Sequence, residues 1–438
     1  MKFDAGHTPK MKPVSPRRSA IVAALDIGTS KIVCTIARLK PQSPQEVLRR
    51  RSHGVEILGV GHTEARGIKS GAVVNLTEVE EALRHAVDIA EREASVQLES
   101  VVVSLSSGRP ASEFYAVKVN VAGSSVTDGD IARALAAGCH HSVRSGRVVL
   151  HSLPMGFSLD GVRGVGEPRG MLAREFGVDM HVVTADVAAA RNIMLAVERC
   201  HLELETMVAA PYVAGLSVLA DDEADIGAAL IDLGAGTTTT AVFSGGRFVH
   251  ADGFALGGNH ITSDLARGLN ARISDAERIK TLHGSVLAGG SDERDMITVP
   301  SVGDDEREPP QFVSRASLVR IIKPRVEEIL EMVRDRLAAS PFAAEPRARA
   351  VLTGGASQLT GLPELASRIL NRPVRIGRPL GISGLPEAAK GPAFAVAAGL
   401  LVYPQVAHLE HFEPRKTRQL MTGTGYIARV GRWLRESF

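Results

Sequence analysis

Cysteine, aromatic residues and net charge are all scarce in this sequence. The 438 residues include three cysteines and 4% aromatic residues, and the formal net charge is +2. Cys34, Cys139 and Cys200 are too scattered for a disulfide framework or a metal-ligand pair, so we expect reduced thiols in a cytosolic protein. A nearly neutral chain has no global attraction to nucleic acid, and no nucleic-acid partner is expected.

Long apolar segments are also missing. No stretch approaches the roughly 20 apolar residues that a membrane-spanning helix needs. The first twenty residues are basic and lack the apolar run of a signal peptide. We therefore expect a protein that is neither secreted nor membrane-spanning, and we expect residues 1–20 to form a disordered basic tail.

The rest of the composition is that of a globular protein with more than one lobe. Hydrophobic residues make up 44% of the chain and charged residues 23%, which is ordinary for a folded protein. A length of 438 residues exceeds the roughly 250–300 residues that one core supports. Strand-like apolar runs alternate with segments of helical periodicity, so the predicted fold class is α/β.

One sequence unit occurs twice. Residues 25–30 read Leu-Asp-Ile-Gly-Thr-Ser, and residues 231–236 read Ile-Asp-Leu-Gly-Ala-Gly. Each copy follows an apolar strand and precedes a second strand rich in β-branched residues. A single Asp-x-Gly could simply form a β-turn, but two copies about two hundred residues apart predict two lobes of related topology that face each other.

The repeated unit has the chemistry of a phosphate site. Glycine lets successive backbone N–H groups turn toward an anion, hydroxyl groups add donors, and carboxylates at strand ends can hold Mg²⁺ through water. A further glycine pair precedes a predicted helix, whose N-terminal amides can also face phosphate. The candidate phosphate-binding residues are Asp26, Gly28, Thr29, Ser30, Lys31, Asp232, Gly234, Ala235, Gly236, Thr237, Thr238, Gly257, Gly258 and Asn259, with Asp26 and Asp232 as the metal candidates.

A third glycine motif predicts a site for the nucleoside. Residues 351–359 run from an apolar strand into a Gly-Gly turn, where backbone can approach a ribose or a flat base. Glu277 and Lys280 lie three apart on a predicted helix and so share one face, although such a pair is usually an ordinary surface pair. The adenosine candidates are Glu277, Lys280, Gly354, Gly355, Ala356 and Gln358.

The order of these three motifs resembles the actin, Hsp70 and sugar-kinase superfamily. Its phosphate 1, phosphate 2 and adenosine motifs correspond to residues 24–37, 228–243 and 351–370. The resemblance implies a two-lobed ATPase fold of duplicated ribonuclease-H-like domains that binds ATP and Mg²⁺. Hsp70-like relatives carry a glutamate before a proline where residues 209–211 here read Ala-Ala-Pro. We therefore expect slow or negligible ATP hydrolysis, and no catalytic residue is assigned.

The last fourteen residues predict an amphipathic helix. At about 100° per residue, its apolar side chains fall on one side and its arginines on the other. A basic helix with aromatic residues on its apolar face is typical of binding to a membrane surface, although a terminal helix can also pack on its own core. The candidate membrane-binding residues are Tyr426, Ile427, Arg429, Val430, Arg432, Trp433, Leu434, Arg435 and Phe438.

Within the superfamily, several strings resemble the FtsA family of bacterial cell-division proteins. These are Gly-Gly-Asn-His-Ile-Thr at 257–262, Ala-Glu-Arg-Ile-Lys at 276–280 and Ile-Lys-Pro-Arg-Val-Glu-Glu-Ile at 322–329. The resemblance implies a 1C-type subdomain inserted in the first lobe, self-polymerisation, and partners that include FtsZ, later division proteins and an anionic membrane. It places the protein on the cytoplasmic face of the inner membrane at the division site. The alternatives are a sugar- or acetate-type kinase of the same fold and a pilus-assembly actin homologue, neither of which explains the amphipathic end.

These arguments predict the following division of the chain. After the tail at 1–20 come the first lobe at 21–98 and 184–225, the insert at 99–183, and the second lobe at 226–283 and 347–379. A small subdomain occupies 284–346, a closing helix of the first lobe 380–403, a flexible linker 404–424, and the amphipathic helix 425–438.

Overall fold

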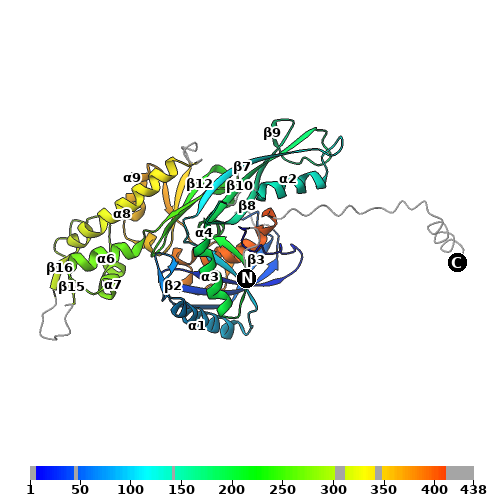
Figure 1. The fold of residues 1–438 in the computed structure, drawn as a ribbon. Helices are drawn as coiled ribbons and strands as arrows, with labels where there is room; N and C mark the ends of the chain where they lie inside the picture. Colours follow the sequence, from blue (N-terminus) through cyan, green and yellow to red (C-terminus); the bar gives the residue numbers. More distant parts are fainter. Residues whose placement is uncertain (1–5, 44–47, 141–143, 301–310, 341–347, 411–438) are drawn as a thin grey trace, which may run out of the picture.

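The computed structural model describes residues 6–43, 48–140, 144–300, 311–340 and 348–410. They form an α/β protein of two lobes with a third body beside them, as the sequence predicts (Figure 1). The predicted amphipathic helix and most of its linker lie outside these residues.

The first lobe is built on a six-stranded sheet with strand order β11-β6-β1-β2-β3-β19. Its interior strand β6 carries Val101, Val102 and Val103, all fully buried, as expected for a strand covered on both faces. The strands are β1 (Ala20–Ile27), β2 (Lys31–Pro41), β3 (His53–Glu64), β6 (Ser100–Leu105), β11 (Glu203–Ala209) and β19 (Ile382–Ser383), with a small pair β4 (Ile68–Lys69) and β5 (Ala72–Val73). The helices are α1 (Leu76–Ala94), α3 (Val187–Arg199), α4 (Ala210–Val218) and α10 (Ala395–Val406).

The second lobe has its own apolar core and repeats the central unit of the first. Its strands are β12 (Ala228–Leu233), β13 (Thr238–Ser244), β14 (Arg247–Phe254), β17 (Arg349–Thr353) and β18 (Val374–Ile376). Helices α6 (Gly258–Leu269), α7 (Ile273–His283), α8 (Arg315–Ala338) and α9 (Leu362–Leu370) belong to this lobe, β15 (Met296–Val299) pairs with β16 (Gln311–Ser314), and α5 (Asp221–Ile226) joins the lobes. The β12–β13 hairpin has the same register as β1–β2, because each is closed by a four-residue turn. The predicted duplication is confirmed.

The insert continues the sheet of the second lobe. It contains β7 (Ala111–Asn120), β8 (Arg147–Leu159), β9 (Val162–Val165), β10 (Glu175–Asp186) and α2 (Asp128–His140). Ala111 of β7 pairs with Asp252 of β14, so one nine-stranded sheet runs through both bodies. The predicted start at residue 99 is wrong, since β6 at 100–105 pairs in parallel with β1 and belongs to the first lobe.

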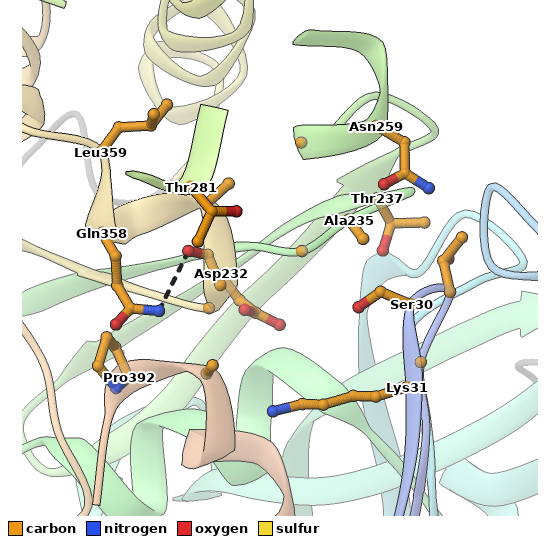
Figure 2. A pocket seen from close by; sticks show the side chains of 18 of the residues that line it. Ser30, Lys31, Asp232, Ala235, Thr237, Asn259, Thr281, Gln358, Leu359 and Pro392 are labelled. Atoms are coloured by element: carbon orange, nitrogen blue, oxygen red, sulfur yellow. Dashed lines mark hydrogen bonds between the residues drawn. The ribbon is translucent and has the colours of Figure 1, made fainter. Parts of the chain in front are cut away.

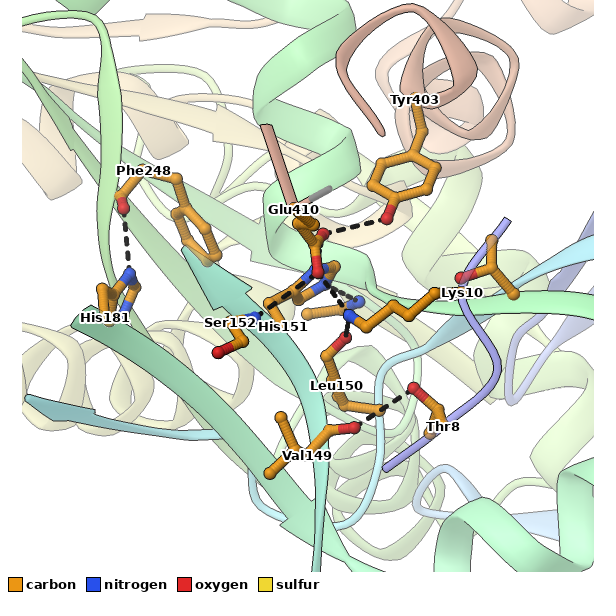
Figure 3. A network of polar contacts seen from close by, with 12 residues as sticks. Thr8, Lys10, Val149, Leu150, His151, Ser152, His181, Phe248, Tyr403 and Glu410 are labelled. Atoms are coloured by element: carbon orange, nitrogen blue, oxygen red, sulfur yellow. Dashed lines mark hydrogen bonds and ion pairs between the residues drawn. The ribbon is translucent and has the colours of Figure 1, made fainter. Parts of the chain in front are cut away.

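The prediction of a disordered tail at residues 1–20 is also wrong from residue 6 onward. Thr8 donates its backbone N–H and its hydroxyl to the Val149 carbonyl, at 3.0 and 3.2 Å. Met11 is 4% exposed, and the Lys10 ammonium reaches into the first lobe and forms an ion pair with Glu410 (Figure 3). The basic composition led to the wrong prediction of disorder, because the charge of Lys10 is neutralised inside the fold by a carboxylate four hundred residues away.

The predicted linker begins too early. Helix α10 continues to Val406, and a 3₁₀ helix covers Ala407–Glu410, so the closing segment of the first lobe ends at least seven residues beyond 403. The span Pro392–Glu410 is long and apolar enough to cross a membrane by composition, contrary to the expectation from the sequence, but 67% of it is buried in the protein. Gly399 lies so close to α4 that a Cβ atom there would be 1.8 Å from the Val213 carbonyl oxygen. The span is therefore a core helix.

His181 of β10 is fully buried where the insert meets the second lobe. Its Nδ1 donates to the Phe248 carbonyl at 2.9 Å (Figure 3), and its Nε2 accepts from the Ser112 hydroxyl at 2.8 Å. Burial lowers the pKa of His181 to about 3. A neutral imidazole thus ties the insert to β14.

Replacing His181 with asparagine is expected to flatten the pH dependence of stability. The folded pKa lies below the unfolded value near 6.5, so the contribution of His181 is complete above about pH 6.5 and is lost as the pH falls. The unfolding free energy of wild type minus variant should decrease by about 1.4 kcal/mol per pH unit below about 6.5. Urea denaturation between about pH 8 and about pH 5 measures it, with the exposed His201→Asn as control. A difference that stays constant over this range would contradict the assignment.

Candidate functional site

A cavity of about 520 Å³ lies where the two duplicated hairpins face each other. The β1–β2 and β12–β13 turns, the first turn of α6, one face of α7 and the 3₁₀ helix Gly355–Gln358 form its walls (Figure 2). The predicted residues that line it are Asp26, Gly28, Thr29, Ser30, Lys31, Asp232, Gly234, Ala235, Thr237, Gly258, Asn259, Glu277, Lys280, Gly354, Gly355, Ala356 and Gln358. Motifs up to about 330 residues apart in the sequence thus meet around one space.

Three predicted residues lie behind the lining. A Cβ atom on Gly236 would be 2.4 Å from Thr29 Oγ1, so Gly236 permits the two turns to touch. The Thr238 hydroxyl donates to the Leu256 carbonyl at 2.8 Å and does not face the cavity. A Cβ atom on Gly257 would be 2.5 Å from the Gly234 carbonyl oxygen. These positions shape the walls.

Ten other lining residues were not among the predicted site residues. They are Ser106, Ala210, Thr281, Leu282, Gly284, Leu359, Thr360, Pro392, Ala393 and Val396. The sequence marked only some of them: Leu359 and Thr360 lie within the adenosine-motif range 351–370, and Thr281 lies one turn after Glu277 on α7. The segment at Pro392 is brought in by hydrogen bonds, because its carbonyl accepts from the Gly354 N–H at 3.1 Å and from the Thr353 hydroxyl at 3.0 Å.

The two turns require glycine because a Cβ atom would not fit there, and not because the backbone has an unusual φ angle. Neither Gly28 nor Gly234 has a positive φ, which corrects the reason given from the sequence. In each turn the glycine N–H bonds the carbonyl three residues on, at 3.0 Å to Lys31 and 2.9 Å to Thr237. A Cβ atom would lie 2.9 Å from that same carbonyl oxygen in both turns. At Gly354, by contrast, φ is +85°, in the region that favours glycine.

The phosphate end of the cavity gathers the buried Asp232 carboxylate, the partly buried Asp26 carboxylate and one ammonium group. Burial raises the pKa of Asp26, against a 2.6 Å hydrogen bond from Ser104. Burial and the neighbouring Asp26 raise the pKa of Asp232 to about 7. Burial lowers the pKa of Lys31 to about 8, and its Nζ lies 3.3 Å from the centre of the Phe394 ring. A divalent cation between the carboxylates would relieve their repulsion.

At the other end, Lys280 holds two helices together. Its Nζ donates to Glu277 Oε2 at 2.7 Å, to the Thr262 hydroxyl at 2.9 Å and to the Gly258 carbonyl at 3.2 Å. The Lys280 side chain is 11% exposed, whereas that of Glu277 is 49% exposed beside the cavity. The pair is therefore no ordinary surface pair, because it joins α7 to the first turn of α6.

The donor set fits a magnesium nucleotide. In proteins Mg²⁺ keeps several bound waters and binds one or two carboxylates together with substrate phosphates. Asp26 and Asp232 can supply the carboxylates. Backbone N–H groups of the turns, the hydroxyls and the start of α6 provide the anion contacts. Among the described lining residues the only acids are Asp26, Asp232 and Glu277, and no group of three metal-ligating side chains occurs in the described part of the chain.

The architecture defines the class of the protein. Two solved structures share the fold: a PilM–PilN type IV pilus biogenesis complex (17% identical, TM-score 0.60, covering 88% of this chain and 98% of that one) and MreB5 of Spiroplasma citri bound to ADP (14%, 0.54, 90% and 98%). These identities support the fold alone. The chain is an actin-like protein with two duplicated lobes around a nucleotide-type cavity.

Sequence comparisons give the family. The model for cell division protein FtsA matches residues 229–399, and that for the SHS2 domain inserted in FtsA matches 108–184. Cell division protein FtsA of Agrobacterium fabrum is 52% identical over 100% of this chain and 99% of its own length, that of Rhizobium meliloti 51% over 98% and 98%, and that of Escherichia coli K12 32% over 95% and 98%. The chain belongs to the FtsA family of cell division proteins. This decides against the kinase and the pilus-assembly alternatives.

Proposed function

We propose that this cell-division protein binds ATP with Mg²⁺ in the cavity between its lobes. The observation that carries the proposal is the convergence of both duplicated turns, the start of α6 and the Gly354–Gly355 turn on one space of about 520 Å³. The volume is suitable for a ligand of nucleotide size. Fold neighbours support it, since solved structures of MreB5 carry ADP and AMPPNP.

The assigned contacts follow the chemistry of each end. The turns at 28–31 and 234–237 and the first turn of α6 hold the phosphates, and Asp26 and Asp232 hold Mg²⁺ through water. Glu277 receives ribose hydroxyls, while Gly354 to Ala356 and Gln358 lie along the base. ATP contacts both lobes and so fixes the angle between them, and hydrolysis is slow because Ala210 stands where relatives of the Hsp70 type carry an acid.

The second part of the proposal concerns attachment. Residues 425–438 bind the anionic inner face of the cytoplasmic membrane, and the protein recruits FtsZ filaments there, polymerises and assembles with later division proteins. A single short helix is a weak anchor, so many copies along a polymer bind more firmly through avidity. Family membership and the basic amphipathic pattern support this part of the proposal.

Trp433→Glu is expected to weaken binding to anionic vesicles by about tenfold, because it places a charge on the apolar face of the helix. Co-sedimentation of the full chain with vesicles, with and without Mg-ATP, measures this effect. Arg17→Gln, at an exposed position distant in sequence from this helix, changes the net charge by the same one unit and controls for a change of charge alone. If both variants pellet like the wild type, the helix is not the anchor. If nothing pellets under any condition, the attachment proposal fails as a whole.

A further inference from the structure

A second cavity, of about 410 Å³, lies on the other side of α4 and shares no lining residue with the first. We call it the junction cavity, because α4, the β8 strand of the insert, the β13–β14 turn and the end of α10 all line it. Its walls are mainly apolar and include Leu153, Met155, Tyr212, Phe248 and Leu409. Tyr212 and Phe248 stack with ring centres 4.3 Å apart in the buried part of this wall.

One buried polar group in this wall has an unused donor. Gln405 is 6% exposed, and its Oε1 accepts from the His53 N–H at 3.0 Å. Its Nε2 is buried without a hydrogen-bond partner among the described residues, although Gln405 lines the cavity. A buried donor that lacks a partner is destabilising. Because Nε2 has almost no accessible surface, the Gln405 side chain must rotate before its amide can donate to a ligand in the cavity.

The chain itself leaves the fold at the edge of this cavity. Leu409 lines the cavity while 48% exposed, and the next residue, Glu410, is fixed by Lys10, His151 and Tyr403 (Figure 3). The fourteen residues 411–424 separate this point from the amphipathic segment. Fourteen residues of random-coil chain span about 20 Å on average, so a segment tethered at that distance has a high effective concentration at the cavity.

We propose that residues 425–438 dock in the junction cavity whenever no membrane is bound. The inference rests on the proposed membrane-binding role of this segment, because the same apolar face serves both surfaces. Off the membrane, that face would otherwise expose Trp433 and its apolar neighbours to water, which folded proteins avoid. A backbone carbonyl or the Tyr426 hydroxyl of the docked segment accepts from Gln405.

Three arginines, Arg50, Arg51 and Arg247, and one carboxylate, Asp221, line the cavity, so the apolar face of the segment, and not overall charge, drives its docking. The Arg51 and Arg247 guanidinium groups donate to backbone carbonyls. The Arg50 guanidinium already binds Asp225 and the Gly246 carbonyl, so it is not free to repel the segment at full strength. Asp221 lines the cavity, accepts from the Arg50 backbone N–H at 3.0 Å and forms no ion pair among the described residues. It is the natural partner for Arg432 or Arg435.

Docking and membrane binding exclude each other. The apparent affinity for vesicles is then reduced by the fraction of molecules with a free segment. If the segment is docked about nine-tenths of the time, releasing it strengthens vesicle binding about tenfold.

The single tryptophan makes the test direct, since all tryptophan emission comes from Trp433. Acrylamide quenching is measured for the full chain without vesicles, and vesicle affinity is measured on the same samples. We expect Trp433 to be protected in the wild type, several-fold more quenchable in Leu409→Glu, and vesicle binding to be tighter in that variant. Leu172→Glu is the matched control, because Leu172 is 78% exposed on the insert. Met155→Glu, at a second position in the lining, must give the same result as Leu409→Glu.

Three results would overturn the inference. In the first, Trp433 of the wild type is as quenchable as in the Leu409→Glu and Met155→Glu variants while vesicle binding persists. This result contradicts docking but is compatible with the proposed function. Protection that increases with protein concentration would assign the docked segment to a second copy of the chain. Protection that survives both cavity variants would place the segment elsewhere. Loss of vesicle binding by every sample, by contrast, is the failure of the proposed function.

Discussion

Replacing Asp232 with asparagine is expected to weaken Mg²⁺-dependent ATP binding by about 10–100-fold, the range found when a residue that orients a metal's ligands is removed. Asp232 is 8% exposed at the end of β12, and asparagine keeps its shape but not its negative charge. Mg²⁺ supplies the positive charge that balances the two carboxylates and the phosphates. Losing one carboxylate therefore weakens the binding of Mg²⁺ more than the binding of the nucleotide itself. Titration of a fluorescent ATP analogue with and without Mg²⁺ measures the effect.

The contrast between the two titrations decides the role of Asp232. If Asp232 holds the metal through water, the variant loses most of the advantage that Mg²⁺ gives and binds the metal-free nucleotide nearly as well as the wild type, or better. Asp179→Asn, on β10 of the insert, is the control and should change neither value. An equal loss with and without Mg²⁺ would mean that Asp232 shapes the cavity and does not serve the metal.

The sequence predicted those parts of the site that consist of short motifs, in particular the motif that occurs twice. The Asp-x-Gly units at 26–28 and 232–234 each combine a buried strand, a turn and a second strand within about fifteen residues, and short-range patterns of this kind are legible without coordinates. The same holds for the Gly-Gly turn at 354–355. The predicted duplication follows from the Asp-x-Gly repeat and the α/β class from the alternation of strand-like and helical segments, whereas the inserted subdomain was implied by the family resemblance.

What escaped prediction depends on contacts between distant parts of the chain. Ser106 and Pro392 line the cavity because strand β6 and the carbonyl contacts at Gly354 bring them there, and no motif marks them. The ordered N-terminal segment was missed for a similar reason, since its basic composition predicts disorder unless the partner carboxylate is known. The end of α10 was missed because residues 404–410 contain a proline and polar residues that are buried by tertiary contacts.

That partner carboxylate carries the last prediction, which is a large loss of stability in Lys10→Met. Glu410 is 2% exposed on its side chain; burial raises its pKa, but Lys10 and His151 outweigh burial and hold the pKa below its usual range. Removing one partner of a buried ion pair costs about 3–5 kcal/mol, and the lower end applies because Lys10 keeps 22% exposure. Chemical denaturation of the full chain measures this loss, and Lys12→Met, which removes an exposed lysine two residues away, is the control.

The pH dependence separates the ion pair from simple packing. Because the folded pKa of Glu410 is depressed, its contribution is present above the unfolded value near 4.5 and is lost as the pH falls through the folded value. The destabilisation by Lys10→Met should therefore be largest near neutral pH and shrink on acidification, once the carboxyl group can take up a proton. A loss that is independent of pH would assign Lys10 to packing through its aliphatic stem. The expected result would instead show that the ion pair with Lys10 holds Glu410, the last residue that the structure describes, against the first lobe.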